Sequence, residues 1–587
     1  MPVLHGDPRP LGVVYTPPEV TAPMTGVALE PLLRGRTADE IRGLRICDPA
    51  IGEGAFLIAA VELIAEHLVA AGLAGCDARR AATGCVHGVD VDPQAVAAAR
   101  AALGAGLGDG PGNGPGNGLG DGPGNGGAQL QVGDALALDW AAAFPAVFAR
   151  GGFDAVIGNP PYVRQEHLAA HKPLLRGFAC YDGAADLYVY FVELAHRLAR
   201  PGGRFCLITP NKWLTAGYAR GLRAYLAAQQ SIEGVVDLGR AALFCTADAF
   251  PCIVWGTAGA PCDTPIQAAR PEPTAPGRAG GARIELLGVG APHPRERWRA
   301  DPWHIDAPGD RALLAQLEHR WPPLAEVVPG RPARGVVTGY NRAFVLDGPT
   351  RERLLDAEPG AASLIRPFTK GRDLRRWLPA EPERWILLVD RGTQLAQLPA
   401  IEAHLARFRA ALEPRPPDWQ GPWHGRKSGP YRWYELQDPV GPLIKARTPR
   451  LLYQDIQTGA VCALDRAGEL VPDTTVWMLP TADLTLLAIL SSPLYAWYAR
   501  RRFPPALNGS VRPKLEYVRT LPVATPPADQ RAALEALVGR RLELEPARRA
   551  GAPDALAAAR ELDGALATAV LEAYELSSAE RALIARG

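Results

Sequence analysis

The sequence lacks several features that would assign it directly to a class of proteins, such as metal-binding, membrane or strongly basic proteins. Its nine cysteines show no paired short spacing of the kind that zinc or redox sites use, so we expect no metal site. No stretch approaches about eighteen uninterrupted apolar residues, and the N-terminus has no basic segment followed by an apolar core. The net charge is only +1, which argues against a polycation. We therefore expect a cytoplasmic protein without a membrane segment, in which any nucleic-acid surface comes from local charge clusters.

Length and apolar content predict several domains. A chain of 587 residues is too long for one ordinary core, since a domain usually takes roughly 100–200 residues. Nearly half of the residues are apolar, so most of the chain can fold. The Gly-, Pro- and Asn-rich residues 104–127 are the exception, and we expect a flexible insertion in a surface loop there.

The most informative stretch is FDAVIGNPPYV, residues 153–163. Its apolar first half predicts a buried strand, and Asn159, Pro160, Pro161 and Tyr162 follow where that strand ends. Open α/β sheets bind their ligands at this position. An Asn side-chain oxygen, a free Pro160 carbonyl and a Tyr ring suit a planar ring that bears an amine. The alternative is a strand followed by a proline-rich turn with an Asn cap.

An earlier glycine-containing turn, DPAIGEG, lies between an expected strand and an apolar helix. Gly52 and Gly54 allow close approach of a ligand to the backbone. A phosphate-binding loop would continue with Lys and Ser or Thr, whereas Ala55 follows here, and the carboxylate of Asp48 repels phosphate. The pattern therefore favours a cationic or neutral ligand.

Two further acidic residues follow expected strands. Asp90 can hold both hydroxyls of a ribose, although a helix cap is the alternative for Asp90 or Asp92. Asp134 could accept from the amino group of an adenine moiety. Farther upstream, Thr16 is expected to cap a short helix. The series of strands and helices predicts an α/β, Rossmann-like domain with a doubly wound, mostly parallel sheet.

The second half of the chain has a different pattern. Residues 261–282 are rich in Pro, Ala, Arg and Gly and predict a linker, after which shorter strands and many turns predict a mixed α+β domain over residues 283–526. Residues 527–587 predict a helical segment. Basic residues and aromatics cluster over residues 366–376, 426–450 and 500–514, which favours a nucleic-acid face, with solvated loops as the alternative. The candidate DNA-binding residues are Arg372, Arg375, Arg426, Lys427, Arg512 and Lys514.

Six motifs in order, TPPEV, DPAIGEGAF, GVDVD, GDAL, GNPPY and LITPNKWL, resemble the adenine-specific DNA methyltransferases of restriction-modification systems, of the TaqI and Eco57I types. The resemblance covers residues 12–255 by motif and extends more weakly to the end. It implies an S-adenosylmethionine-dependent catalytic domain over residues 1–260, followed by a target-recognition domain.

The resemblance also implies roles for individual residues. Asn159, Pro160 and Tyr162 would be catalytic, and Tyr162 with Phe244 would pack against the target base. Cofactor contacts would run from the methionine part through the charged amino end and the ribose to the adenine. They would come from Thr16, Asp48, Ala50, Gly52, Asp90, Val91, Asp134, Ala135, Asn159 and Pro161.

The implied reaction is methyl transfer to the N6 amine of an adenine that is flipped out of duplex DNA. RNA methylation, methylation of a protein glutamine, and a catalytically silent DNA-binding protein are the alternatives. Because TPPEV begins at residue 16, we expect no nuclease in front of it. A separately encoded restriction endonuclease as partner and a solitary or defence-associated methylase are the two alternatives.

Overall fold

The computed structural model describes residues 16–105, 127–229, 231–238, 250–259, 264–270, 290–504, 506 and 510–586. The chain divides into two compact units, Met1–Pro308 and Gly309–Gly587, each of which is described by itself. Most of the predicted glycine-rich insertion lies outside the described residues.

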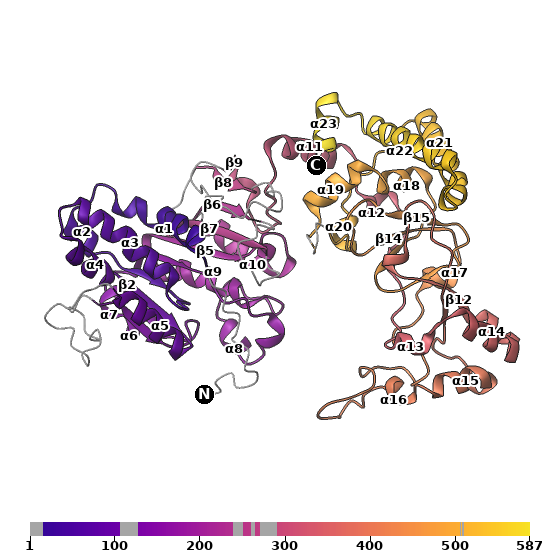
Figure 1. Cartoon of the computed structure of the whole chain (residues 1–587), viewed down its shortest axis with the longest axis horizontal. Coiled ribbons are helices and arrows are strands. Elements are labelled where there is room, and N and C mark those ends of the chain that lie inside the picture. Colours follow the sequence, from indigo (N-terminus) through magenta and orange to yellow (C-terminus); the bar gives the residue numbers. More distant parts are fainter. Residues whose placement is uncertain are drawn as a thin grey trace. The chain divides into compact units, whose positions relative to one another are not determined.

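A nine-stranded sheet forms the centre of the first unit, in the order β3-β2-β1-β4-β5-β7-β6-β8-β9. Strands β1 to β5 are mutually parallel, and β7 runs antiparallel to both β5 and β6. Figure 1 shows this sheet with helices packed around it. The strands are β1 (Ile46–Asp48), β2 (Val86–Asp90), β3 (Gln129–Val132), β4 (Phe153–Gly158), β5 (Ala199–Pro210), β6 (Ile232–Asp237), β7 (Pro251–Thr257), β8 (Ile266–Ala269) and β9 (Ala291–His293).

Helices cover both faces of this sheet because its strands are apolar on both sides. Side chains alternate along a strand, so Phe205 and Leu207 of β5 enter one core while Cys206 and Ile208 enter the other. The first core contains α6 (Trp140–Ala143), α7 (Pro145–Phe148), α9 (Leu187–Leu198) and α10 (Arg220–Gln229). The second contains α1 (Pro18–Leu33), α2 (Ala38–Arg42), α3 (Ala55–Ala70), α4 (Gly75–Thr83) and α5 (Pro93–Gly104). The predicted doubly wound sheet is confirmed.

Two local predictions are wrong. Thr16 does not cap the first helix: α1 begins at Pro18 after Pro17, which has no side-chain cap bond, and it is sixteen residues long. Part of the predicted linker is a strand, because β8 pairs in parallel with β6 and antiparallel with β9 at the edge of the sheet. Its four residues are too few for a period-two pattern to stand out in the sequence.

The second unit is the expected mixture of strands and helices. One sheet has the order β10-β17-β14-β15 and the other β11-β13-β12-β16. The strands are β10 (Ala333–Arg334), β11 (Val345–Leu346), β12 (Ile365–Thr369), β13 (Trp385–Leu387), β14 (Arg450–Gln454), β15 (Cys462–Asp465), β16 (Val471–Pro472) and β17 (Val476–Leu479). The helices around them are α11 (Pro308–Arg320), α12 (Leu324–Val327), α13 (Asn341–Phe344), α14 (Gly348–Ala357), α15 (Pro399–Ala406), α16 (Arg409–Leu412), α17 (Pro442–Ala446), α18 (Leu484–Leu490), α19 (Pro493–Arg502) and α20 (Leu515–Val518).

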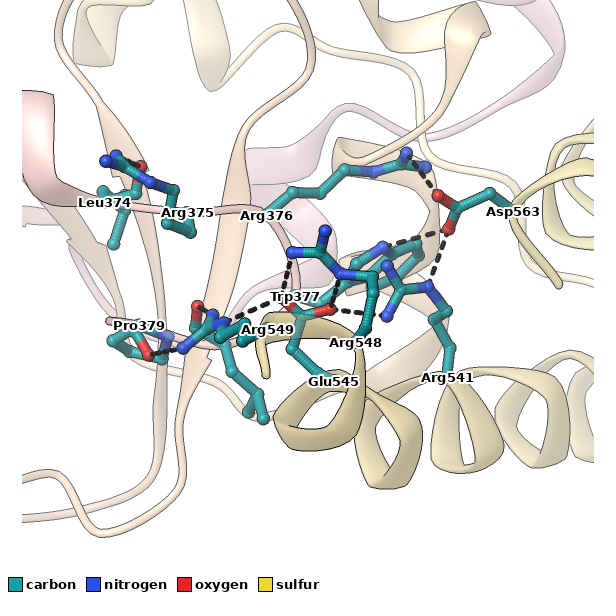
Figure 2. Close-up of polar contacts among 11 residues, drawn as sticks. Leu374, Arg375, Arg376, Trp377, Pro379, Arg541, Glu545, Arg548, Arg549 and Asp563 are labelled. Carbon is teal, nitrogen blue, oxygen red and sulfur yellow. Dashed lines mark hydrogen bonds and ion pairs between the residues drawn. The ribbon is translucent and has the colours of Figure 1, made fainter. Parts of the chain in front are cut away.

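The last residues form α21 (Ala528–Arg549), α22 (Pro553–Ala573) and α23 (Ser578–Arg586), as the predicted helical tail requires. A polar network ties these helices to the rest of the unit (Figure 2). Asp563 of α22 accepts hydrogen bonds from the Trp377 indole at 3.1 Å and from Arg541 at 3.0 Å, and pairs with Arg376. Trp377 is buried, with φ at +77°, a backbone conformation that is costly for a large side chain.

Glu545 is the second centre of the network. It is fully buried and pairs with Arg541, Arg548 and Arg549 (Figure 2). Burial opposes its ionisation, but the hydrogen bonds from these arginines prevail and hold its pKa at about 2. Arg549 also donates to main-chain carbonyls near the sheet, so α21 is joined to the segment that follows Trp377.

Candidate active site

A cavity of about 340 Å³ opens at the edge of the first sheet where the parallel strands end. The strand order reverses between β1 and β4, and ligands of open α/β sheets bind at such a switch point. Every predicted catalytic or cofactor residue within the described part of the chain lines this cavity. They are Thr16, Asp48, Ala50, Gly52, Asp90, Val91, Asp134, Ala135, Asn159, Pro160, Pro161 and Tyr162.

Asp48 is the most deeply buried carboxylate of the cavity, with 1% of its surface exposed. Burial raises the pKa of its carboxyl to about 7; the Ala50 N–H, which donates to Asp48 at 3.0 Å, opposes this rise, and the charge of Asp90 adds to it. Gly158, the last residue of β4, makes room for this side chain, since a Cβ there would lie 2.5 Å from Asp48 Oδ1. The sequence alone does not indicate this role of Gly158, because the two residues become neighbours only when β1 pairs with β4.

The glycine turn is held by Asp90. Gly52 has φ +50°, and its N–H donates to Asp90 Oδ2 at 2.9 Å. The other oxygen of Asp90 accepts from the N–H of Asp92, which in turn caps α5 by accepting from Gln94. Asp92 is thus the helix cap, and Asp90 lies in the cavity.

Asp134 and two histidines form another part of the wall. Asp134 accepts from the Leu136 N–H at 3.0 Å, and its second oxygen lies 3.7 Å from His171 Nε2. His167 and His171 follow the Asn159 loop in the chain and were not predicted as site residues. No periodic pattern or motif marks them in the sequence.

Asn159 has a defined side-chain orientation. Its Nδ2 donates to Thr16 Oγ1 at 3.1 Å, and Thr16 is itself buried. Its Oδ1 is buried and, among the described residues, has no hydrogen-bond partner. The amide is therefore fixed at its nitrogen, while its acceptor oxygen stays available inside the cavity.

Tyr162 lies on the same loop, two residues past the predicted Pro160 acceptor. Its ring meets the Tyr188 ring edge-on, with 6.4 Å between ring centroids. Its hydroxyl is buried without a partner in the described structure, and burial raises the Tyr162 pKa well above its ordinary value. The phenol therefore stays neutral. Phe244, the other predicted base-stacking residue, lies outside the described residues.

Five of the six predicted DNA-binding residues of the second unit are at least partly exposed, and the sixth, Arg426, is buried. Arg372, Arg375, Lys427 and Lys514 are exposed, and Arg512 is partly exposed and pairs with Asp455 at 2.9 Å.

The prediction for Arg426 is wrong. This residue is 3% exposed, and its guanidinium donates to five main-chain carbonyls. A side chain used in this way has no donor left for a phosphate.

In the parts of the chain that the structure describes, no group of three or more His, Cys, Asp or Glu residues is placed to hold a metal ion. None of the described helices is both long enough and apolar enough to cross a membrane.

The chain is similar to known proteins both in sequence and in fold. Residues 84–244 match the family model of the Eco57I restriction-modification methylase. The chain is 27% identical over 391 residues to the type II methyltransferase M.PaeR7I of Pseudomonas aeruginosa, covering 63% of this chain and 64% of that relative, slightly less than two thirds of its length. It is 23% identical over 538 residues to the type II methyltransferase M.BstVI of Geobacillus stearothermophilus, covering 88% of this chain and 90% of that one.

Among solved structures, the fold is similar to that of the type IIL restriction-modification enzyme MmeI in complex with DNA. The TM-score is 0.61 at 15% identity, over 96% of this chain and 75% of the other. At this identity the likeness shows the fold alone. In sequence, residues 84–244 are similar to the Eco57I restriction-modification methylases, and the chain is similar over most of its length to type II methyltransferases.

Proposed function

We propose that this protein is a site-specific DNA-adenine methyltransferase of a restriction-modification or phage-defence system. It transfers the methyl group of S-adenosylmethionine to the N6 amine of an adenine flipped out of duplex DNA. The observation that carries this proposal is the state of Asn159, whose amide nitrogen is held by Thr16 while its carbonyl oxygen is buried and available. The match of residues 84–244 to the Eco57I methylase family model and the similar fold of a DNA-bound restriction-modification enzyme support it.

The cavity has the chemistry that this cofactor needs. Asp48, Asp90 and Asp134 line it, and none of the described lining residues is Lys or Arg. A phosphate-bearing nucleotide would be repelled, whereas a cationic ligand lowers the cost of ionising the buried Asp48. S-adenosylmethionine fits because it is a cation with an adenosine part, and when bound it supplies an electrophilic methyl group.

Asn159 and Pro160 would activate the acceptor amine. The lone pair of an adenine amine is delocalised into the ring, which makes the amine a poor nucleophile. Asn159 Oδ1 and the Pro160 carbonyl can accept its two hydrogens and favour a pyramidal nitrogen. The hydrogen bond from Asn159 to Thr16 keeps the amide from turning its nitrogen toward the amine, so the acceptor is oriented before the substrate arrives.

Tyr162 would capture the base. Flipping a nucleotide costs a few kcal/mol, and stacking on an aromatic ring contributes roughly 1–3 kcal/mol per base. The edge-on contact with Tyr188 limits rotation of the Tyr162 ring. We propose Phe244 as the second stacking residue.

The second unit would bind the duplex. Arg372, Arg375, Lys427 and Lys514 are exposed and can reach phosphates, and Arg512 can do so where it is not paired with Asp455. We propose that the enzyme acts in the cytoplasm of its host cell and that a separately encoded restriction endonuclease, where one is present, recognises the same sequence.

The test is methyl transfer by the full chain from labelled S-adenosylmethionine to unmethylated duplex DNA, with RNA of the same sequences as the alternative acceptor. We expect N6-methyladenine in DNA by mass spectrometry and none in RNA. Asn159→Ala should abolish transfer while cofactor binding, measured by calorimetry, stays within a few-fold of wild type. Methylated RNA, methylated cytosine or an active Asn159→Ala enzyme would contradict the proposal.

A further inference from the structure

The buried Arg426 side chain holds one loop of the second unit in place. This loop, here called the Trp419 loop, comprises residues 414–432 and follows α16 (Figure 1). It contains five prolines, which restrict its backbone. Trp419 lies within it with 47% of its surface exposed. Single exposed apolar residues are common on protein surfaces, but Trp419 belongs to a loop whose fixed conformation keeps its ring exposed.

The base of the loop is fixed by Arg426. The five carbonyls that accept from its guanidinium come from three separate stretches of the second unit: Thr338, Leu412, and Arg432, Trp433 and Glu435. The guanidinium also lies 4.5 Å from the centroid of the Tyr431 ring.

The backbone at the base of the loop pairs as well. Arg415 and Arg426 are joined by a main-chain hydrogen bond of 3.0 Å, and the Arg426 N–H donates to the Glu413 carbonyl. Gly425 makes this approach possible, because a Cβ there would lie 2.2 Å from that carbonyl oxygen. The loop therefore leaves the unit at a defined place.

Its tip is fixed by two indoles. Trp423 donates from Nε1 to the Glu413 carbonyl at 3.1 Å, and Trp419 donates to the Pro422 carbonyl at 3.0 Å. The two rings meet edge-on with 5.3 Å between their centroids. The polar end of Trp419 is thus satisfied internally while its ring stays exposed. Such a side chain loses little conformational freedom when a partner covers it.

The charge of the loop indicates the class of partner. Its exposed charged side chains are Arg415, Lys427 and Arg432 against the single carboxylate of Asp418. A rigid aromatic ring on a loop that carries an excess of cations fits a polyanion whose subunits carry flat rings.

We propose that the Trp419 loop is a DNA-contacting element, in which the Trp419 ring packs against bases or sugars of the duplex while Lys427 contacts a phosphate. The inference rests on the proposed function, since it takes DNA as the substrate. It assigns Arg426 as the residue that positions the loop and Trp419 as the residue that touches DNA.

The test uses the full chain with Trp419→Ala and Trp419→Phe. Leu556→Ala serves as the matched control, because Leu556 is also an exposed apolar residue of the second unit, 36% exposed on α22. The probe is a fluorescently labelled duplex of randomised sequence, with binding followed by anisotropy. We expect Trp419→Ala to weaken binding about tenfold, the loss of one aromatic stack, and Trp419→Phe to stay within about twofold of wild type. Leu556→Ala should bind like wild type.

The salt dependence separates the two roles. Lys427→Gln should lower the slope of log Kd against log salt by about one phosphate contact, whereas Trp419→Ala should leave the slope unchanged. Equal binding by Trp419→Ala and Leu556→Ala would overturn the inference. So would a Trp419→Ala protein that keeps its DNA affinity but loses self-association in light scattering, because the loop would then contact protein.

Binding and methyl transfer are separate measurements. If the chain binds DNA through Trp419 but does not methylate it, this result overturns only the proposed function. A chain whose Trp419→Ala form binds and methylates DNA like wild type overturns only the assignment of the loop.

Discussion

Replacing Asp48 with Asn should stabilise the protein without cofactor at pH 8 and weaken cofactor binding. The carboxyl is 1% exposed, and its pKa is about 7 against an ordinary value of 3.8. A difference of about three pKa units corresponds to about 4 kcal/mol that the folded protein loses when Asp48 ionises. Because surrounding groups relax, we expect a measured gain of about 1–2 kcal/mol for Asp48→Asn at pH 8.

The pH dependence has a definite sign. Between about pH 4 and pH 7, the folded protein keeps a proton on Asp48 that the unfolded chain has already released. The contribution of this group to stability is therefore fully present below the ordinary pKa and is lost as the pH rises through 7. The advantage of Asp48→Asn should be present at pH 8 and vanish near pH 4.

The assay is urea unfolding of the wild type and Asp48→Asn without cofactor, at pH 5 and pH 8. Asp154→Asn is a matched control, because Asp154 is equally buried on the same sheet but pairs with Arg200 at 2.7 Å, so this variant should be less stable than wild type at pH 8. Calorimetry in buffers of different ionisation enthalpy should show proton release when S-adenosylmethionine binds to the wild type near pH 7, and none for Asp48→Asn. An Asp48→Asn protein that is destabilised equally at both pH values, together with binding that releases no proton, would refute the reasoning.

Three further changes test other parts of the structure. Thr16→Val should lower the methylation rate at saturating substrate by about ten- to a hundredfold with little change in cofactor affinity, while Thr16→Ser keeps the rate, because only the hydroxyl orients Asn159; equal rates for Val and Ser would contradict this role. Gly158→Ala should cost about 1–3 kcal/mol in urea unfolding and weaken cofactor binding, since its Cβ would lie 2.5 Å from Asp48 Oδ1; unchanged binding would show that Asp48 can move freely. Glu545→Gln should destabilise the second unit by about 3–5 kcal/mol in the same assay, because three arginines lose their buried partner; a loss below about 1 kcal/mol would show that the network is not stabilising.

Most residues of the candidate site could be predicted from the sequence because they lie at or just after the end of a strand. Buried strands and glycine turns have local signatures, and parallel strands bring their carboxyl ends to one edge whatever their separation in the chain. For this reason Asp48, Asp90, Asp134 and Asn159 could be placed in one cavity without knowing the strand order.

The tertiary structure alone decided which partners these residues and their neighbours have. Thr16 holds Asn159 across 143 positions of sequence, and Gly158 makes room for Asp48 only because β1 and β4 are paired. Arg426 and Lys427 are adjacent basic residues in the chain, yet one is buried among carbonyls and the other is exposed. Local sequence records the charge of an arginine, whereas its role depends on whether distant backbone carbonyls converge on it, and only the folded chain determines that.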